Sequence, residues 1–433
     1  MPALRRSAMP PLRTMTTAFF PVSQRRGRAL SPARERGVAL LALVVFLGLV
    51  ASLFVVRSLS ADTLRARLEQ RTTEALVRAK EALLAYAVAN INRPGGLPCP
   101  DWDGDGRSVP PTEYAGGTCV NGFVGRVPWR TLGLAPVADG SGETIWFAMS
   151  NLFQDAQPLG TAPFINPDTP AALAIAGQAN DLVAVLFAPG APLQGQIRND
   201  ALSRMQSINF LEGSNGTGVP PFLADAPSAT FNDRLLAISR QELMAQVQLR
   251  VASETARALA DYFALYGFLP AAGDFGNVQC VDQGVTAGCQ PLAGLLAGRV
   301  PANASPGFDY VAGRPQQLLR GNVNSPTDWF QLQRWRENVI YLVSPECVGP
   351  PANFCAQGAL SVRGPGIAPI DNARFVVLMG GVAVVGQQRA TPADRLLLVN
   401  YVEGSELLAV QQLVAGAVPA QIVVNRGTVV ATR

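Results

Sequence analysis

The chain has 433 residues, of which 48% are hydrophobic, and it contains 41 glycines, 34 prolines and no histidine. This composition predicts folded, turn-rich domains and excludes nucleophile pairs and zinc sites that depend on imidazole. The formal charge of +4 comes from residues 1–37, which hold eight arginines and one glutamate; the other 27 basic and 30 acidic residues give a net charge of −3, which does not favour nucleic acid as a partner.

Residues 1–37 form a basic segment that ends in Gly37, and we interpret it as a leader removed by processing. Residues 38–56 follow without any charged side chain. At about 1.5 Å per residue, these 19 residues are long enough to cross the hydrocarbon core of a bilayer, which is about 30 Å thick. We therefore expect a transmembrane helix over residues 38–56, with the basic leader on the cytoplasmic side.

The apolar run continues into an amphipathic segment without a helix stop. From Ser60 to Tyr86, apolar residues recur at intervals of three and four, and arginine, glutamate and lysine occupy the opposite face. This pattern predicts one long helix that leaves the membrane and forms the spine of an external domain.

A basic leader that ends in glycine, an apolar helix directly after it and an amphipathic continuation resemble the N-terminus of type IV pilins and type II secretion pseudopilins. The resemblance implies that a prepilin peptidase cuts after Gly37 and that Val38 becomes an N-methylated mature terminus. Most family members carry glutamate at the fifth mature position, where this chain has Ala42. Because type II tip subunits also lack that glutamate, the resemblance implies a minor or tip-like subunit. An uncleaved signal-anchor helix is the alternative.

An acidic loop follows the long helix. Asp101, Asp103 and Asp105, with Gly106 after them, fit the first six positions of a calcium-binding loop, in which carboxylates converge and glycine permits a sharp turn. The twelfth position, which should supply a bidentate glutamate, is Thr112, and Glu113 comes one residue later. The pattern predicts a structural Ca²⁺ site with these four acidic residues as ligands; an acidic turn without metal is the alternative.

Six cysteines fall into three short-range pairs: Cys99 and Cys119, Cys280 and Cys289, and Cys347 and Cys355. Six cysteines allow fifteen pairings, and proximity favours this one. An even number of cysteines without a metal-binding spacing indicates structural disulfides in an oxidising compartment.

Several sequence blocks occur twice in the same order after the long helix. They are GRVP at residues 125–128 and 298–301, ETIWFAMS at 143–150 against ENVIYLVS at 337–344, LQGQIR at 193–198 against VGQQR at 385–389, and NFLEGS at 209–214 against NYVEGS at 400–405. We expect an α+β fold in which a pilin-like helix packs on an antiparallel sheet, with this module duplicated in tandem. Only the first copy would have the transmembrane half of its helix.

The predicted boundaries place the first module at residues 57–215 and a Gly- and Pro-rich linker at residues 216–238. The second module, residues 239–433, begins with a helix because Ser239 and Glu242 have the spacing of a capping box, and Gly267 would end that helix. Residues 421–425 and 428–432 predict a C-terminal hairpin turned at residues 425–427.

Together these features predict a non-enzymatic minor subunit, at the tip or in a priming position, of a type IV pilus or a type II secretion pseudopilus. It would lie in the bacterial inner membrane with a periplasmic C-terminal region. Its partners would be other pilin or pseudopilin subunits through the N-terminal helix, the prepilin peptidase and the membrane. The alternative is an uncleaved, signal-anchored periplasmic binding or adhesion protein. No enzyme is expected, because there is no histidine, nucleophile elbow, phosphate-binding loop or dinucleotide fingerprint.

Overall fold

The computed structural model describes residues 33–108, 114–115, 117–120, 122–155, 164–281, 289–301, 329–349, 355–365, 367–424 and 428–432. Within these ranges the fold is α+β, with several antiparallel sheets. The chain divides into two compact units, Met1–Arg65 and Ala66–Arg433, and helix α1 (Ala33–Ala89) contributes residues to both.

In the first unit, α1 carries a run of exposed apolar side chains. Each of the large ones has 47% to 68% of its surface exposed; they are Leu40, Leu41, Leu43, Val44, Val45, Phe46, Leu47, Leu49 and Val50. This run is the part of the long helix that the sequence places next to the leader.

Among the helices in the described ranges, none combines the length and the apolar composition that a membrane crossing requires. The transmembrane helix predicted over residues 38–56 is therefore wrong, and anchoring in the inner membrane has no support.

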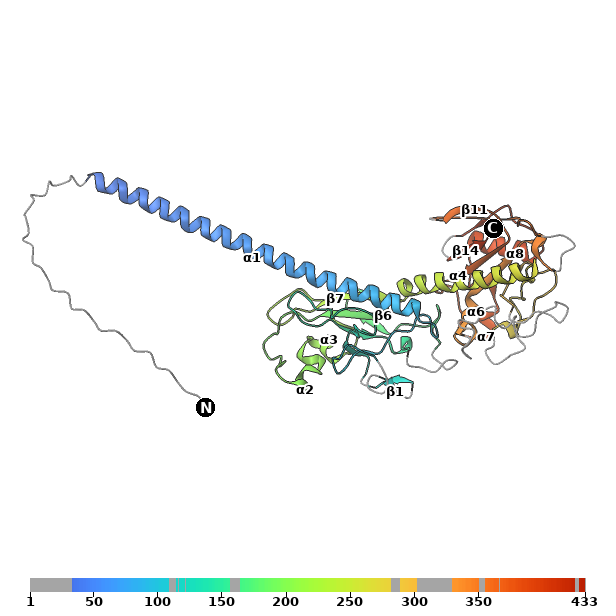
Figure 1. The fold of residues 1–433 in the computed structure, drawn as a ribbon, viewed down its shortest axis with the longest axis horizontal. Helices are drawn as coiled ribbons and strands as arrows, with labels where there is room; N and C mark the ends of the chain where they lie inside the picture. The colour runs from blue at the N-terminus through green and yellow to red at the C-terminus, as the bar shows by residue number, and fades with distance from the viewer. Residues whose placement is uncertain are drawn as a thin grey trace, which may run out of the picture. The chain divides into compact units, whose positions relative to one another are not determined.

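The first module of the second unit is an antiparallel sheet covered by the end of α1. Strands β3 (Val124–Arg126), β4 (Trp146–Met149) and β6 (Ala179–Ala188) pair in that order, and β6 also pairs with β5 (Leu173–Ile175) and β7 (Arg234–Ser239). α1 buries Leu76, Ala79, Leu83 and Ala87 in one core with this sheet, as their three- and four-residue spacing requires. Figure 1 shows the end of α1 beside β6 and β7.

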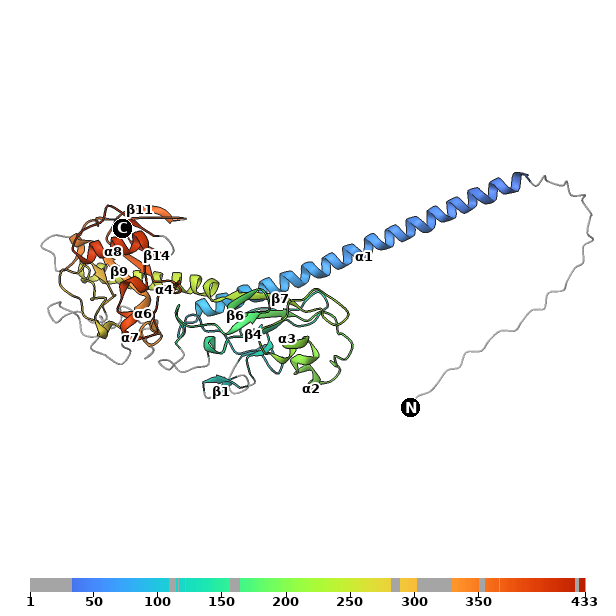
Figure 2. The same ribbon diagram turned by 180° about the vertical axis from the view of Figure 1, so that it is seen from behind.

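Successive side chains along each strand point to opposite faces of the sheet, and both faces of this sheet are buried. Phe147 and Val183 belong to the core under the helices, whereas Trp146 and Phe187 belong to a second core that includes Phe210. Short helices lie on the side of the second core, as Figure 2 shows from behind: α2 (Ala201–Arg204), the 3₁₀ helix η2 (Ser207–Asn209) and α3 (Gly213–Thr217). β7 (Arg234–Ser239), which begins within the predicted linker of residues 216–238, completes this sheet.

The second module contains a sheet with the same order of strands. β14 (Val429–Thr432), β12 (Phe375–Met379), β9 (Val339–Val343) and β8 (Ala297–Gly298) are neighbours in that order, as β7, β6, β4 and β3 are in the first module. Helix α4 (Arg240–Tyr266) packs on β12 and β14. The repeated sequence blocks fall on equivalent strands: the GRVP blocks overlap β3 and β8, and the blocks at residues 143–150 and 337–344 contain β4 and β9.

Helix α4 begins and ends at the residues that the sequence indicates. The Ser239 hydroxyl accepts a hydrogen bond from the Glu242 amide at 3.1 Å, and Gly267 follows the last turn with a φ of 74°. The Glu242 carboxylate does not complete the capping box. It pairs instead with Lys80 of α1 at 2.8 Å, so the first turn of α4 is tied to the first module.

The two C-terminal strands join different sheets. β13 (Ile422–Val423) pairs in parallel with β10 (Leu360–Gly364), which also pairs with β11 (Ile367–Ala373), whereas β14 pairs with β12. The predicted C-terminal hairpin is therefore corrected: both strands find partners far away in sequence. Its turn, residues 425–427, lies outside the described residues.

The remaining elements are short. The strands are β1 (Tyr114–Ala115) and β2 (Thr118–Cys119). The helices are α5 (Trp329–Leu332), α6 (Trp335–Asn338), α7 (Pro392–Arg395) and α8 (Gly404–Val414), and the 3₁₀ helices are η1 (Asn151–Phe153), η3 (Val278–Cys280), η5 (Pro345–Cys347) and η6 (Leu398–Asn400).

Candidate functional site

The acidic loop lies against the edge strand β3 of the first module. Asp101 and Arg126 exchange two backbone hydrogen bonds, each of 2.9 Å. Gly125 permits this approach, because a Cβ there would come within 3.0 Å of the Asp101 carbonyl oxygen. The Cys99–Cys119 disulfide closes the segment that contains the loop.

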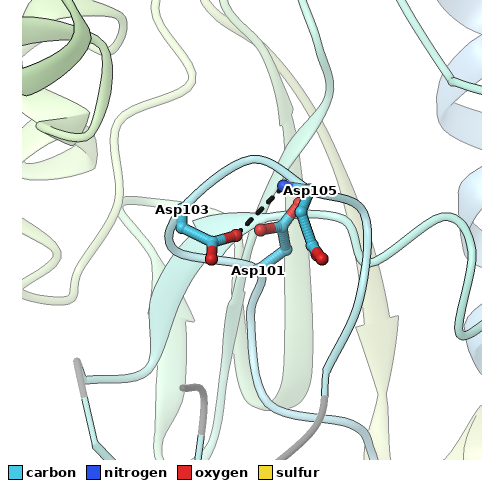
Figure 3. A group of neighbouring side chains, drawn as sticks. All are labelled: Asp101, Asp103 and Asp105. Atoms are coloured by element: carbon cyan, nitrogen blue, oxygen red, sulfur yellow. Dashed lines mark hydrogen bonds between the residues drawn. The ribbon is translucent and has the colours of Figure 1, made fainter.

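The three aspartates fold the loop by accepting backbone amides. The two oxygens of Asp101 accept from Gly104 N at 2.7 Å and from Gly106 N at 2.8 Å. Asp103 accepts from the Asp105 amide at 3.0 Å, as the dashed line in Figure 3 shows. One carboxylate oxygen from each aspartate lies within 4.8 Å of the others, so the loop brings the predicted ligands together.

The charge of this cluster is uneven. Asp101 is buried, with 1% of its surface exposed, whereas Asp103 and Asp105 are exposed. Burial raises the pKa of Asp101 to about 6, although the two amide hydrogen bonds and nearby Arg126 oppose that shift. Three convergent carboxylates suit a hard cation such as Ca²⁺. The loop's internal hydrogen bonds also account for its shape without metal, and Glu113 lies outside the described residues, so the calcium site stays a prediction.

A pair of acids, which the sequence does not single out, lies further along the first module: Asp233 is buried and Glu212 is partly exposed. The Glu212 amide donates to Asp233 Oδ2 at 2.9 Å, and the Asp233 amide donates to Glu212 Oε2 at 3.1 Å. Asn215 also donates to Asp233 Oδ2, at 2.9 Å. Burial, with the neighbouring charge of Glu212, raises the pKa of Asp233 to about 8.

A buried arginine network organises the short helices of the first module. Arg198 Nε donates to the Asn209 carbonyl at 2.7 Å, and its Nη2 donates to Gln196 Oε1 at 2.5 Å. The guanidinium carbon lies 4.5 Å from the ring centre of Phe210, which is a cation–π distance. This side chain therefore fixes the segment before α2 against the segment after η2.

The same network recurs in the second module. Arg389 Nε donates to the Asn400 carbonyl at 2.6 Å, and its Nη2 donates to Gln387 Oε1 at 3.1 Å. Its guanidinium carbon lies 4.3 Å from the ring centre of Tyr401. The repeated glutamine, arginine and asparagine of the sequence blocks are the signal that identifies this network from sequence.

A second arginine in each module also donates to the backbone of the short helices. Arg126 donates to the Arg204 carbonyl, and Arg299 donates to the Arg395 carbonyl at 2.6 Å. Arg299 also donates to the carbonyl of Glu337. Both belong to the repeated GRVP block, so that block supplies a side chain that ties the edge strand to the short helices.

The carboxylates that balance these arginines differ in exposure. In the first module, Arg198 pairs with Glu143 at 2.9 Å, and the Glu143 side chain is 26% exposed. In the second, Arg395 pairs with Glu337 at 2.9 Å, and the Glu337 side chain is only 4% exposed. Burial raises the pKa of Glu337 to about 7, against the arginines around it.

The predicted cysteine pairs all form. Disulfides join Cys99 to Cys119, Cys280 to Cys289 and Cys347 to Cys355. They indicate an oxidising environment, such as the periplasm or the outside of the cell.

The predicted processing residues Gly37 and Val38 lie within α1. Processing after Gly37 remains a prediction. No family model, curated protein or solved structure matches this chain. Function is therefore inferred from sequence pattern and geometry.

Proposed function

We propose that this chain is a non-enzymatic minor subunit of a filament of the type IV pilus or type II secretion pseudopilus class, assembled through α1. The observation that carries the proposal is the difference in burial between the two ends of this 57-residue helix. Its C-terminal residues, such as Leu83, are buried under a sheet, whereas its N-terminal apolar residues, such as Phe46, are exposed. Contiguous exposed apolar surface favours a protein partner, and helices of neighbouring subunits would cover it.

Three further features support the proposal. The three disulfides suit a subunit that functions outside the cytoplasm. The doubled head is bulky, and Ala42 stands where most subunits of this class carry glutamate, which favours a tip or priming position. The assigned role requires no chemistry from the head, whose buried charged groups are held in structural networks.

The decisive test is the mature N-terminus of the protein from its native cells, determined by mass spectrometry of the terminal peptide. The proposal expects a terminus at Val38, N-methylated, and recovery of the protein in the sheared filament fraction. A Gly37→Leu variant should keep its leader and disappear from that fraction, whereas the neighbouring Ala39→Gly variant should be processed normally. An intact leader on the wild-type protein, with none in filaments, would overturn the proposal.

A further inference from the structure

Residues 165–169 of the first module reach into the second module. The Ile165 amide donates to Gln333 Oε1 at 2.9 Å, and Asn166 Nδ2 donates to the Gln333 carbonyl at 3.0 Å. Gln333 is fully buried. One glutamine of the second module therefore binds both the backbone and a side chain of this loop.

The loop then places a carboxylate on the repeated arginine of the second module. Asp168 Oδ1 lies 2.9 Å from Arg389 Nη1, and only 2% of the arginine side chain is exposed. The same Nη1 donates to Asn338 Oδ1 at 3.1 Å and to the Gly381 carbonyl at 2.8 Å. Asp168 therefore enters a polar site whose other members belong to the second module.

Hydrogen bonds within the loop hold its shape. The Asp168 amide donates to Asn166 Oδ1 at 2.8 Å, and the Asn166 amide donates to Thr169 Oγ1 at 3.0 Å. Arg240, the first residue of α4, donates to the Pro167 carbonyl at 3.1 Å. The helix that leads into the second module thus holds the same loop from its other side.

Comparison of the two arginine networks shows what Asp168 replaces. Arg198 and Arg389 make the same hydrogen bonds to asparagine and glutamine. The carboxylate on Arg198 is Glu143, from its own module. The matching glutamate of the second module, Glu337, pairs with Arg395 instead. The counter-charge of Arg389 comes from the other module.

We infer that residues 165–169 form a latch: the first module supplies, through Asp168, the carboxylate that the second module's buried arginine needs. Because an unpaired buried guanidinium is strongly destabilising, the second module reaches full stability only with the latch engaged. The first module thereby contributes to the stability of the second, and this coupling does not depend on the assignment of the chain to a filament.

Hydrogen exchange of the full-length, disulfide-bonded chain tests the latch. In Asp168→Asn, which keeps the shape of the side chain and removes its charge, exchange in β9 and β12 should accelerate roughly 10-fold, because Arg389 is only 2% exposed although Asp168 itself is 23% exposed. Exchange in β4 and β6 should stay within a few-fold of wild type. The matched variant Glu143→Gln, which breaks the equivalent pair inside the first module, should leave β9 and β12 unchanged.

Equal acceleration in both modules, or none in β9 and β12, would overturn the latch. In an Arg389→Met background, Asp168→Asn should add little further acceleration; an undiminished effect would show that the pair is not responsible. If Asp168→Asn does not fold, Asn166→Ala gives a second test, because it removes the donor to the Gln333 carbonyl together with the acceptor for the Asp168 amide. That variant should accelerate exchange in β9 and β12 more than in β4 and β6, and the opposite order would refute the latch.

Discussion

In the first module, the carboxylate that balances the repeated arginine comes from the module itself and is partly exposed. In the second module, Glu337, which balances Arg395, is buried, whereas Asp168, which balances the repeated Arg389, comes from the first module. The strand order and the arginine network are the same in both. One backbone arrangement can thus be stabilised by ion pairs of very different burial, and burial decides how much each pair matters.

The largest expected effect is that of Glu337→Ala. It leaves Arg395 without a carboxylate at a position where the glutamate side chain is only 4% exposed. Loss of one partner from a buried pair costs about 3–5 kcal/mol of unfolding free energy. Chemical unfolding at pH 8 or above, where Glu337 is ionised, measures this loss.

The matched variant in the first module is Glu143→Ala. Because Glu143 is 26% exposed, its pair with Arg198 is screened by solvent, and the expected loss is about 1 kcal/mol or less. Equal losses for the two variants would show that the difference in burial has no energetic consequence.

The acid pair of the first module predicts a pH dependence. Burial raises the pKa of Asp233 from 3.8 to about 8, so the folded chain keeps a proton that the unfolded chain releases above pH 4. The free energy of unfolding should therefore fall as the pH rises from about 4 to 8. The slope is at most about 1.4 kcal/mol per pH unit, and the total a few kcal/mol.

Asp233→Asn removes the titrating proton and keeps a group that accepts from the Glu212 amide. This variant should show a flatter dependence of unfolding free energy on pH between 5 and 8, and should be more stable than wild type at pH 8. Denaturant unfolding at several pH values measures both. An unchanged slope would mean that Asp233 ionises normally in the folded chain.

Local sequence signals predicted much of this fold. Short spacing was sufficient for the three disulfides, and capping chemistry at Ser239 and Gly267 was sufficient for the ends of α4. The predicted membrane span was wrong, since no helix among the described residues is both long and apolar enough to cross a membrane. These signals depend on residues close together in the chain.

Contacts between distant residues could not be predicted in this way. The β13 and β14 strands resemble a hairpin locally, but each pairs with a strand far away in sequence. Asp168 looks like an ordinary turn residue until Arg389 is placed beside it. The three carboxylates of the acidic loop were predictable because they alternate within one turn, whereas the arginine networks combine segments from several elements.

The acidic loop is a second difference between the two modules. Asp101 exchanges backbone hydrogen bonds with Arg126, whereas Gly273 does so with Arg299 at the equivalent edge of the other sheet. If Ca²⁺ binds the three aspartates, 1 mM calcium should stabilise the first module alone, by roughly 1–4 kcal/mol for dissociation constants between about 0.2 mM and about 1 μM. Thermal unfolding with calcium or with chelator measures this effect.

The control for calcium is Asp103→Asn. Asp103 is exposed, and its hydrogen bond to the Asp105 amide can be kept by the asparagine oxygen. The variant should therefore fold as wild type does without calcium and lose the calcium-dependent stabilisation. Absence of any calcium effect on the wild-type chain would identify the loop as an acidic turn.

The glutamines of the two networks provide a further comparison of the two modules. Gln196→Ala and Gln387→Ala each remove an acceptor from a buried arginine, at 2.5 Å and 3.1 Å respectively. A hydrogen bond to a charged group contributes about 1.5–3 kcal/mol, and each arginine keeps its carbonyl partners, so we expect a loss of about 1–2 kcal/mol for either variant. Gln196 also donates to Glu212 at 2.7 Å, which should make its loss slightly the larger. Gln387→Ala could instead lower the free energy of unfolding by over about 1 kcal/mol more than Gln196→Ala. That result would show that the burial of Arg389 strengthens its hydrogen bond to glutamine as much as burial strengthens the ion pairs.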